Sequence, residues 1–206
     1  MAPGRESKEK KMRSAITMDK VHSYAPIVTK WWSKWWAAAV CFVVVLLGTA
    51  HYITFVVNVT DSLPQKMFIV WKQEKSVGRG DFVAFPWPKD LVYPKGIGFI
   101  KQVAGVPGDT VVVNENREFT VIRQQSGASN IPGSTPEPMT RSVGRAKTHG
   151  EKGNMRGVPL ELGFTGVIPE GYLYVYAWSK DSLDSRYAIL GLVRQDQVIG
   201  RATPLL

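Results

Sequence analysis

The sequence is poor in the side chains that bind metals or form disulfides. It has one cysteine and three histidines among 206 residues. Cys41 has no second cysteine with which to form an intrachain disulfide, and the histidines are too scattered to form a Cys/His cluster with zinc spacing. We therefore expect neither a metal site nor a cofactor in this chain.

Acidic residues are also scarce. Lysine and arginine number 26 against 17 aspartates and glutamates, which gives a net charge of +9. Such a balance is typical of proteins that bind nucleic acid or an anionic membrane surface. Residues 1–34 are polar and basic, and we interpret them as a poorly ordered cytoplasmic tail. A nucleic-acid-binding arm is the alternative. Because the membrane segment that follows already explains the charge, we expect no nucleic acid partner.

The longest apolar run extends from Trp35 to Val59, and only His51 within it can carry a charge. About 20 apolar residues in a helix cross a bilayer, and the tryptophans at the amino end of the run are typical of a membrane interface. We predict a transmembrane helix over 35–59, with the basic tail inside and the rest of the chain outside. A cleaved signal peptide ending at Gly48-Thr49-Ala50 is the alternative, although the apolar run continues beyond that point.

The chain after the apolar run has the pattern of a β-domain. Short apolar runs such as 67–71, 82–85 and 97–104 alternate with turns that contain glycine or proline, and no sustained helical period occurs. We predict a mostly β fold over 60–206, preceded by one transmembrane helix. Within this domain, residues 118–164 are rich in Gly, Pro, Ser and charge, and we expect them to form a loop-rich, partly mobile insertion.

Candidate chemistry lies in three separate stretches, which are Asp61–Phe68, Phe99–Val103 and Asp181–Arg186. Ser62 stands just after the apolar run, and a serine hydroxyl needs a base to become a good nucleophile. No plausible His/Asp pair is present, because His22 lies in the tail and His149 in the insertion. Lys101 can serve as the base if burial lowers its pKa.

Strand alternation favours an inward position for Lys101. The lysine shares one face of its strand with Phe99 and Val103. This arrangement would keep Lys101 dry, unlike Lys75 or Lys89. On the strand pattern alone, a snorkelling or salt-bridged lysine on an exposed strand fits equally well.

Together the three stretches resemble the type I signal peptidases, which are membrane-anchored serine proteases with a Ser/Lys dyad. The resemblance rests on Ser-x-Pro after a transmembrane segment, on Phe-Ile-Lys-Gln-Val-Ala-Gly-Val-Pro-Gly-Asp, and on Asp-Ser-x-Asp-Ser-Arg near the carboxyl end. It covers about Thr60 to Pro204, with the middle insertion unmatched. It implies a signal-peptidase-like β-domain that acts as a serine endopeptidase.

The resemblance also implies a role for individual residues. Ser62 would be the nucleophile and Lys101 the general base. The backbone N–H of Ser62 and the hydroxyl of Thr60 would stabilise the oxyanion. In the family, a serine hydrogen-bonds the lysine and an ion pair holds the terminal box. These supporting residues correspond to Ser182, Asp184 and Arg186.

The sequence departs from the housekeeping members of the family at two places. Leu63 follows the serine where those enzymes usually have methionine, and the run Ser-Leu-Pro-Gln-Lys-Met-Phe is more similar to the TraF branch of conjugative-transfer peptidases, which mature pilin subunits. The Gly-Asp-Asn-Arg that normally opens the terminal box is replaced by Tyr176-Ala177-Trp178-Ser179. Two alternatives stay open: a housekeeping signal peptidase, and a non-enzymatic, membrane-anchored assembly factor for secretion or pili.

The resemblance further implies partners and a location. The partners would be a secreted or pilin precursor protein and the lipid bilayer. The chain would cross the bacterial inner membrane once, with its amino terminus in the cytoplasm and its catalytic domain in the periplasm. Neither the identity of the precursor nor the choice between cleavage alone and cleavage with cyclisation follows from the sequence.

Overall fold

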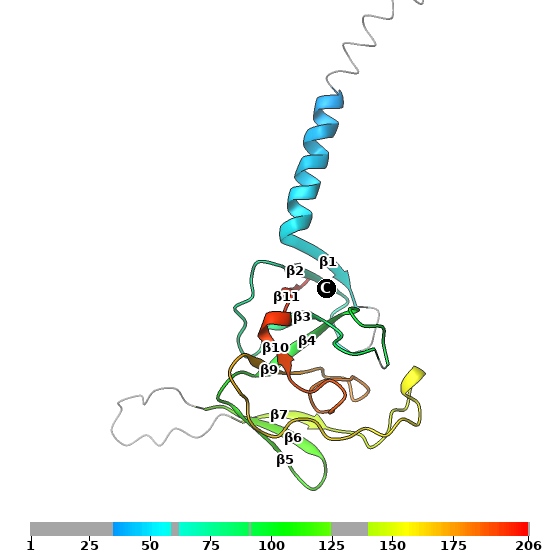
Figure 1. Ribbon diagram of the computed structural model, residues 1–206, viewed down its shortest axis with the longest axis vertical. Coiled ribbons are helices and arrows are strands. Elements are labelled where there is room, and N and C mark those ends of the chain that lie inside the picture. The colour runs from blue at the N-terminus through cyan, green and yellow to red at the C-terminus, as the bar shows by residue number, and fades with distance from the viewer. Residues whose placement is uncertain (1–34, 59–61, 91, 125–139, 206) are drawn as a thin grey trace, which may run out of the picture. The chain divides into compact units, whose positions relative to one another are not determined.

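A computed structural model of the chain describes residues 35–58, 62–90, 92–124 and 140–205 (Figure 1). The chain divides into two compact units, Met1–Ala50 and His51–Leu206. The first described element is the helix Trp35–Tyr52, which has 18 residues and is long and apolar enough to cross a membrane. The predicted basic tail, residues 1–34, lies outside the described residues.

The apolar run is not helical throughout, so the predicted helix over 35–59 is too long. The helix ends at Tyr52, and strand β1 (Ile53–Val57) follows directly. β1 pairs antiparallel with β2 (Met67–Trp71) along its whole length. Its sequence, ITFVV, is rich in β-branched and aromatic residues, which pack well in strands. The apolar composition that suggested a longer membrane helix therefore belongs in part to the edge of a sheet.

β1 is the first strand of a seven-stranded sheet with the order β1-β2-β11-β3-β4-β9-β10. Its remaining strands are β3 (Phe82–Pro86), β4 (Gly98–Gly105), β9 (Tyr172–Tyr176), β10 (Val193–Arg194) and β11 (Gly200–Pro204). All neighbouring strands in this sheet are antiparallel. The predicted mostly β fold is confirmed.

A second, smaller sheet has the order β7-β6-β5-β8 and is also antiparallel. Its strands are β5 (Thr110–Val113), β6 (Glu118–Ile122), β7 (Thr140–Arg145) and β8 (Gly166–Val167). Two 3-10 turns complete the described elements, η1 (Gly153–Met155) and η2 (Gln195–Gln197).

The predicted insertion, 118–164, contains more regular structure than its composition suggested. β6 and β7 both lie within it. The reason is the alternation in Glu118–Ile122, where Phe119 and Val121 point into the core and are buried. The Ser- and Pro-rich segment 125–139, one of the two stretches on which the expectation of mobility rested, lies outside the described residues.

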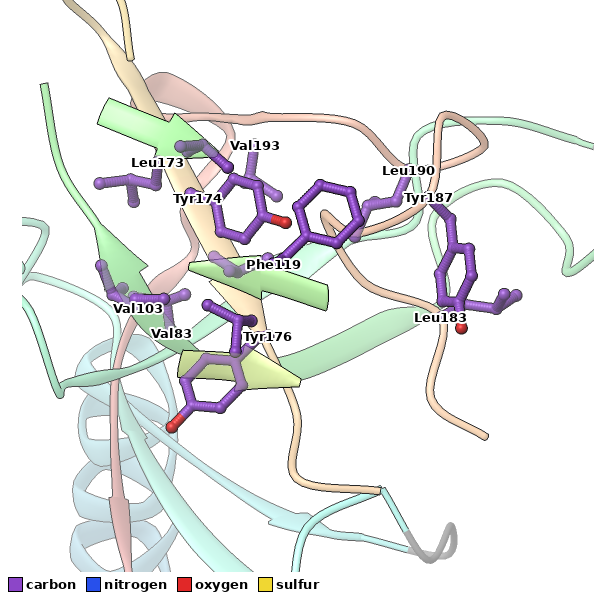
Figure 2. Packing of buried hydrophobic residues seen from close by; sticks show 14 of the residues in the cluster. Val83, Val103, Phe119, Leu173, Tyr174, Tyr176, Leu183, Tyr187, Leu190 and Val193 are labelled. Carbon is purple, nitrogen blue, oxygen red and sulfur yellow. The ribbon is translucent and has the colours of Figure 1, made fainter. Parts of the chain in front are cut away.

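The main hydrophobic core draws side chains from both sheets (Figure 2). The rings of Phe119 on β6 and Tyr174 on β9 lie with centroids 6.3 Å apart. The sheets approach closely at Gly105, where a Cβ would lie 2.5 Å from Ile168 Cδ1 and 3.0 Å from Val121 Cγ1. This packing holds β4 and β9 firmly, and these two strands carry or adjoin most of the candidate site.

A smaller buried cluster lies beneath the turn that contains Ser62. Its members are Leu63, Phe68, Val70, Ala84, Ala177 and Ala202. Phe68 and Val70 alternate along β2 and therefore point to the same side of the sheet. Burial of a side chain the size of leucine contributes about 1.5–3 kcal/mol to stability, so Leu63 anchors the turn beside Ser62.

Candidate active site

The turn at Ser62 is fixed on both sides by contacts to the β-domain. Leu63 is buried, while Ser62 itself is half-buried. The Asn58 side-chain amide donates hydrogen bonds to the carbonyls of Leu63, at 3.2 Å, and Gln65, at 3.1 Å. The N–H of Ser179 donates to the Ser62 carbonyl at 3.3 Å. The serine therefore sits on a backbone that is held in place before any substrate binds.

Lys101 lies in the middle of β4, between β3 and β9, and only 2% of it is exposed. The prediction of a dry, inward lysine is confirmed. Lys75 and Lys89, in contrast, are exposed. Burial lowers the Lys101 pKa to about 8, while the charge of Asp184 opposes the shift and that of Arg186 adds to it. A substantial fraction of Lys101 is therefore neutral near pH 8 and able to accept a proton.

An apolar wall explains why Lys101 is dry. Phe99, two residues earlier on the same face of β4, lies beneath the amine, with Nζ 5.6 Å from the ring centroid. Trp87 and Tyr93 extend this wall, with ring centroids 5.0 and 5.3 Å from that of Phe99. Tyr93 was missed by the sequence reasoning, because it lies outside the three stretches and nothing in its local pattern connects it to them.

Ser182 is the hydrogen-bond partner of Lys101. The amine donates to Ser182 Oγ over 2.5 Å, and both groups are buried. A neutral amine has two N–H donors and one lone pair. A donor committed to Ser182 restricts the directions in which the lone pair can point. The contact brings together two positions that are 81 residues apart in the sequence.

Asp184 and Arg186 form a buried, bidentate ion pair below Ser182. The guanidinium donates to Asp184 Oδ1 over 2.8 Å and to Oδ2 over 2.7 Å. Asp184 also accepts the N–H of Ala177 at 3.0 Å, and Arg186 donates to the carbonyl of Ser179 at 3.2 Å. Burial acts against the charge of Arg186, but the hydrogen bond to Asp184 raises its pKa. The ion pair therefore holds residues 182–186 against the turn that follows β9.

The box also docks directly onto β9 and onto a close-packed glycine. The N–H of Val175 donates to Ser185 Oγ at 3.0 Å, and the N–H of Ser185 donates to the Val175 carbonyl at 3.0 Å. Gly163 lies against the same box, and a Cβ there would be 2.1 Å from the Ser185 carbonyl oxygen. Gly163 therefore allows the chain to pass close to the backbone of Ser185 and Arg186.

Ser62, Lys101 and Ser182 line one hollow of about 190 Å³. Phe99, Tyr93 and Leu183 add apolar surface to it. A segment within the predicted insertion contributes Gly150, Met155 and Leu160, and a set of charged residues completes the lining. The charged residues are Lys147, Glu151, Lys152, Lys180 and Asp181.

The structure therefore brings together three of the predicted site residues in one hollow and places the predicted ion pair beneath them. Thr60, the predicted second oxyanion donor, lies outside the described residues. Sequence reasoning missed the wall from the insertion. Its only sequence signal was a methionine and a leucine within an otherwise polar stretch.

The turn 176–179, where the sequence departs from the family pattern, forms a polar network on the other side of β4. Gln102 Oε1 accepts hydrogen bonds from Tyr176 OH at 2.8 Å, Trp178 Nε1 at 3.2 Å and Arg141 Nη2 at 3.0 Å. Gln102 follows Lys101, so its side chain points to the opposite face of the strand. The side chains of Tyr176 and Trp178 in this turn therefore contact Gln102, whereas Ser179 lines the hollow that contains Lys101.

The site offers hydroxyl and amine groups rather than a set of metal ligands. Among the residues that the structure describes, no group of three or more His, Cys, Asp or Glu side chains could hold a metal ion. The chemistry that the described groups can support is nucleophilic attack by a serine with a buried amine as base.

Comparison with known proteins identifies the family of this chain. The family model described as "Signal peptidase, peptidase S26" matches residues 29–206. The curated protein "Signal peptidase I" of Pseudomonas aeruginosa is 27% identical over 139 residues, which are 60% of this chain and 47% of that protein. The chain therefore spans about half of the length of this relative. Because the family match covers most of the sequence, the chain belongs to the signal peptidase S26 family.

Proposed function

We propose that this chain is a membrane-anchored serine endopeptidase that cleaves secreted precursor proteins, with Ser62 as nucleophile and Lys101 as general base. The observation that carries the proposal is a buried lysine, hydrogen-bonded to Ser182 and lining the same hollow as Ser62. Membership in the signal peptidase S26 family supports the reaction class and the kind of substrate.

The reaction follows from these groups. Neutral Lys101 takes the hydroxyl proton of Ser62 as Oγ attacks the scissile carbonyl. The backbone N–H of Ser62, with Thr60 as a second donor, stabilises the negative charge on the carbonyl oxygen. The C–N bond then breaks, and the Lys101 ammonium returns the proton to the leaving amine. Water, deprotonated by the same lysine, hydrolyses the acyl-enzyme and frees Ser62.

Ser182 and the buried ion pair have supporting roles in this scheme. Ser182 accepts an N–H of Lys101, which holds the amine in one orientation while its protonation state changes. The Asp184–Arg186 pair holds the turn that presents Ser182. Neither Asp184 nor Arg186 needs to touch the substrate.

The helix Trp35–Tyr52 supports the anchoring part of the proposal. The excess of Lys and Arg in residues 1–34 favours an amino terminus in the cytoplasm and a β-domain in the periplasm of a bacterial inner membrane. A periplasm-active reporter fused after Leu206 should therefore be active, while a cytoplasm-active reporter at the same place should not. The opposite pattern would contradict this orientation.

The substrate within the precursor class is proposed from the Ser62 turn. Its Ser-Leu-Pro-Gln-Lys-Met-Phe run resembles the TraF branch, which favours a pilin precursor in conjugative transfer. Intact-mass measurement of the product would separate cleavage from cleavage with cyclisation, because a cyclised product is lighter by one water molecule. A chain that processes general secretory precursors but not pilin precursors would belong with the housekeeping enzymes instead.

The test of the proposed activity uses the full chain in detergent with purified precursors. Ser62→Ala and Lys101→Met should abolish cleavage, because each removes one member of the dyad. Lys66→Ala, an exposed lysine four residues from the serine, should keep wild-type turnover within a few-fold. If Ser62→Ala cleaves a verified precursor as fast as wild type, the proposed chemistry is wrong and the assembly-factor hypothesis takes its place.

A further inference from the structure

One wall of the hollow comes from the segment 147–160, which we call the strap. Its two ends are joined by one side chain. The Arg117 guanidinium donates to the carbonyls of Lys147 at 2.9 Å and Leu160 at 2.8 Å. The N–H of Leu160 donates to the Thr148 carbonyl at 2.7 Å. The ends of the strap are therefore fixed to the small sheet.

The strap is also packed against itself. His149 forms a β-bridge with Pro159, and Gly150 forms one with Arg156. Gly150 lies so close to Met155 that a Cβ on it would be 2.1 Å from the Met155 carbonyl oxygen. Met155 and Leu160 are buried, and both line the hollow. The strap thus presents a defined apolar surface to the hollow.

One carboxylate connects the strap to the turn that carries Ser182. Asp181 forms ion pairs with Lys147 at the start of the strap and with Lys152 near its tip, the latter at 2.7 Å. Hydrogen bonds from Lys147 and then Lys152 lower the Asp181 pKa to about 2, so the carboxylate stays ionised. Asp181 directly precedes Ser182, the partner of Lys101.

We propose that Asp181 is a positioning residue that holds the strap against the catalytic turn, so that Met155 and Leu160 form the substrate-binding wall of the hollow. The proposal rests on the proposed function and adds to it the element that determines how tightly a precursor binds. In the wild-type chain the wall and Ser182 keep a constant spacing, because Asp181 joins both. Without the carboxylate, the strap keeps its ends but loses the contact that fixes its tip.

A positioning role predicts a specific kinetic pattern. Asp181→Asn should raise KM about tenfold while kcat and its pH dependence stay near wild type, because the strap contacts substrate and not the dyad. Asp181→Glu should restore most of the loss, since it keeps the charge. High salt, roughly 1 M NaCl, should raise the KM of wild type but not of Asp181→Asn, because salt screens half-exposed ion pairs.

A cycle with Met155→Ala tests whether Asp181 acts through the strap. If it does, the two substitutions share one effect, and the double variant should bind precursor little worse than either single variant. Asp196→Asn is the matched control, since it removes an aspartate from an exposed ion pair with Arg194 outside the hollow. Its KM should equal that of wild type at every salt concentration.

Limited trypsin digestion gives a readout that needs no catalysis. Lys152 and Arg156 are exposed cleavage sites on the strap, and Asp181→Asn should be cut there several-fold faster than wild type or Asp196→Asn. Unchanged digestion with unchanged KM would overturn the inference, and so would a shifted pH profile of kcat, which would place Asp181 on the dyad. If cleavage of precursor proved independent of Ser62, the proposed function would fail, whereas the digestion result would still report on the strap.

Discussion

Lys101 and Lys147 line the same hollow and have opposite properties. Lys101 is 2% exposed. The nearby carboxylate of Asp184 forms an ion pair with Arg186 and not with Lys101. Burial lowers its pKa to about 8. The Lys147 side chain is 22% exposed and contacts Asp181 and Glu151 directly. The hydrogen bond to Asp181, followed by that to Glu151, raises its pKa.

The difference shows that the partner and the solvent, rather than the residue type, decide what a lysine can do. Lys101 is buried and has a hydroxyl rather than a carboxylate as its hydrogen-bond partner, so its neutral form is accessible. Lys147 has carboxylate partners and remains a cation. One lysine is suited to take a proton, and the other is suited to hold a structure by charge.

The largest expected effect is on the rate of precursor cleavage, and it distinguishes Lys101 from Lys147. Lys101→Arg should lower kcat by about 10²–10⁴-fold, which is the range for loss of a general base. Arginine keeps the charge but cannot be deprotonated in a protein. Lys147→Arg keeps the cation that its site requires and should stay within several-fold of wild type. Cleavage of a verified precursor by both variants measures the contrast, and equal activities would make Lys101 a structural cation.

The next contrast concerns the two aspartates and stability. Asp184→Asn leaves Arg186 buried without its partner and should lower the free energy of unfolding by about 3–5 kcal/mol. Asp181→Asn breaks half-exposed pairs and should cost about 0–1 kcal/mol. Denaturant unfolding of both variants at one pH gives the comparison. A loss at Asp181 as large as that at Asp184 would show that the strap supports the fold as a whole.

Removal of Lys101 and removal of Lys147 should change the free energy of unfolding in opposite directions. Lys101→Met should stabilise the protein at pH 7 by up to about 3 kcal/mol, because a pKa lowered from 10.5 to about 8 means that protonated Lys101 is unfavourable in the folded state. The unfolded chain binds this proton more tightly, so wild type should lose stability as the pH falls from about 10 to about 8. Lys147→Met should instead destabilise slightly. Thermal unfolding at pH 7 and pH 10 tests both signs.

The pH dependence of kcat/KM tests which lysine acts as the base. Because only neutral Lys101 accepts the serine proton, kcat/KM should fall about tenfold per pH unit below a midpoint near pH 8. Lys147→Met should lower kcat/KM through KM and leave this midpoint in place. Phe99→Ala should change the burial of Lys101 and therefore shift the midpoint. If the midpoint instead shifts in Lys147→Met and not in Phe99→Ala, the titrating group lies at the rim of the hollow.

The candidate dyad was accessible to sequence reasoning because its signals are local. Alternation along Phe99–Val103 allowed an inward Lys101, and the two other short motifs, with which it resembles the signal peptidases, favoured that position over an exposed one. The strap was not accessible, because its composition resembles that of a mobile loop. Its order comes from Arg117, which reaches both of its ends from β5–β6, and from Asp181 in a distant turn.

The end of the first helix also could not be predicted from the local sequence. Hydrophobicity could not distinguish the helix Trp35–Tyr52 from strand β1, since both are apolar. The distinction depends on β2, which offers β1 five paired residues.

The sequence by itself determined the chemical groups in this protein: a serine after an apolar run, a lysine within a strand-like apolar stretch, and a compact Asp-Ser-x-Asp-Ser-Arg motif. Only the tertiary structure decided their properties. The 2.5 Å contact between Lys101 and Ser182, and the contribution of the strap to the same hollow, join residues distant in sequence, and burial lowers the pKa of the lysine. Desolvation and ion pairing depend on what surrounds a group in space, and no local pattern of residues specifies that.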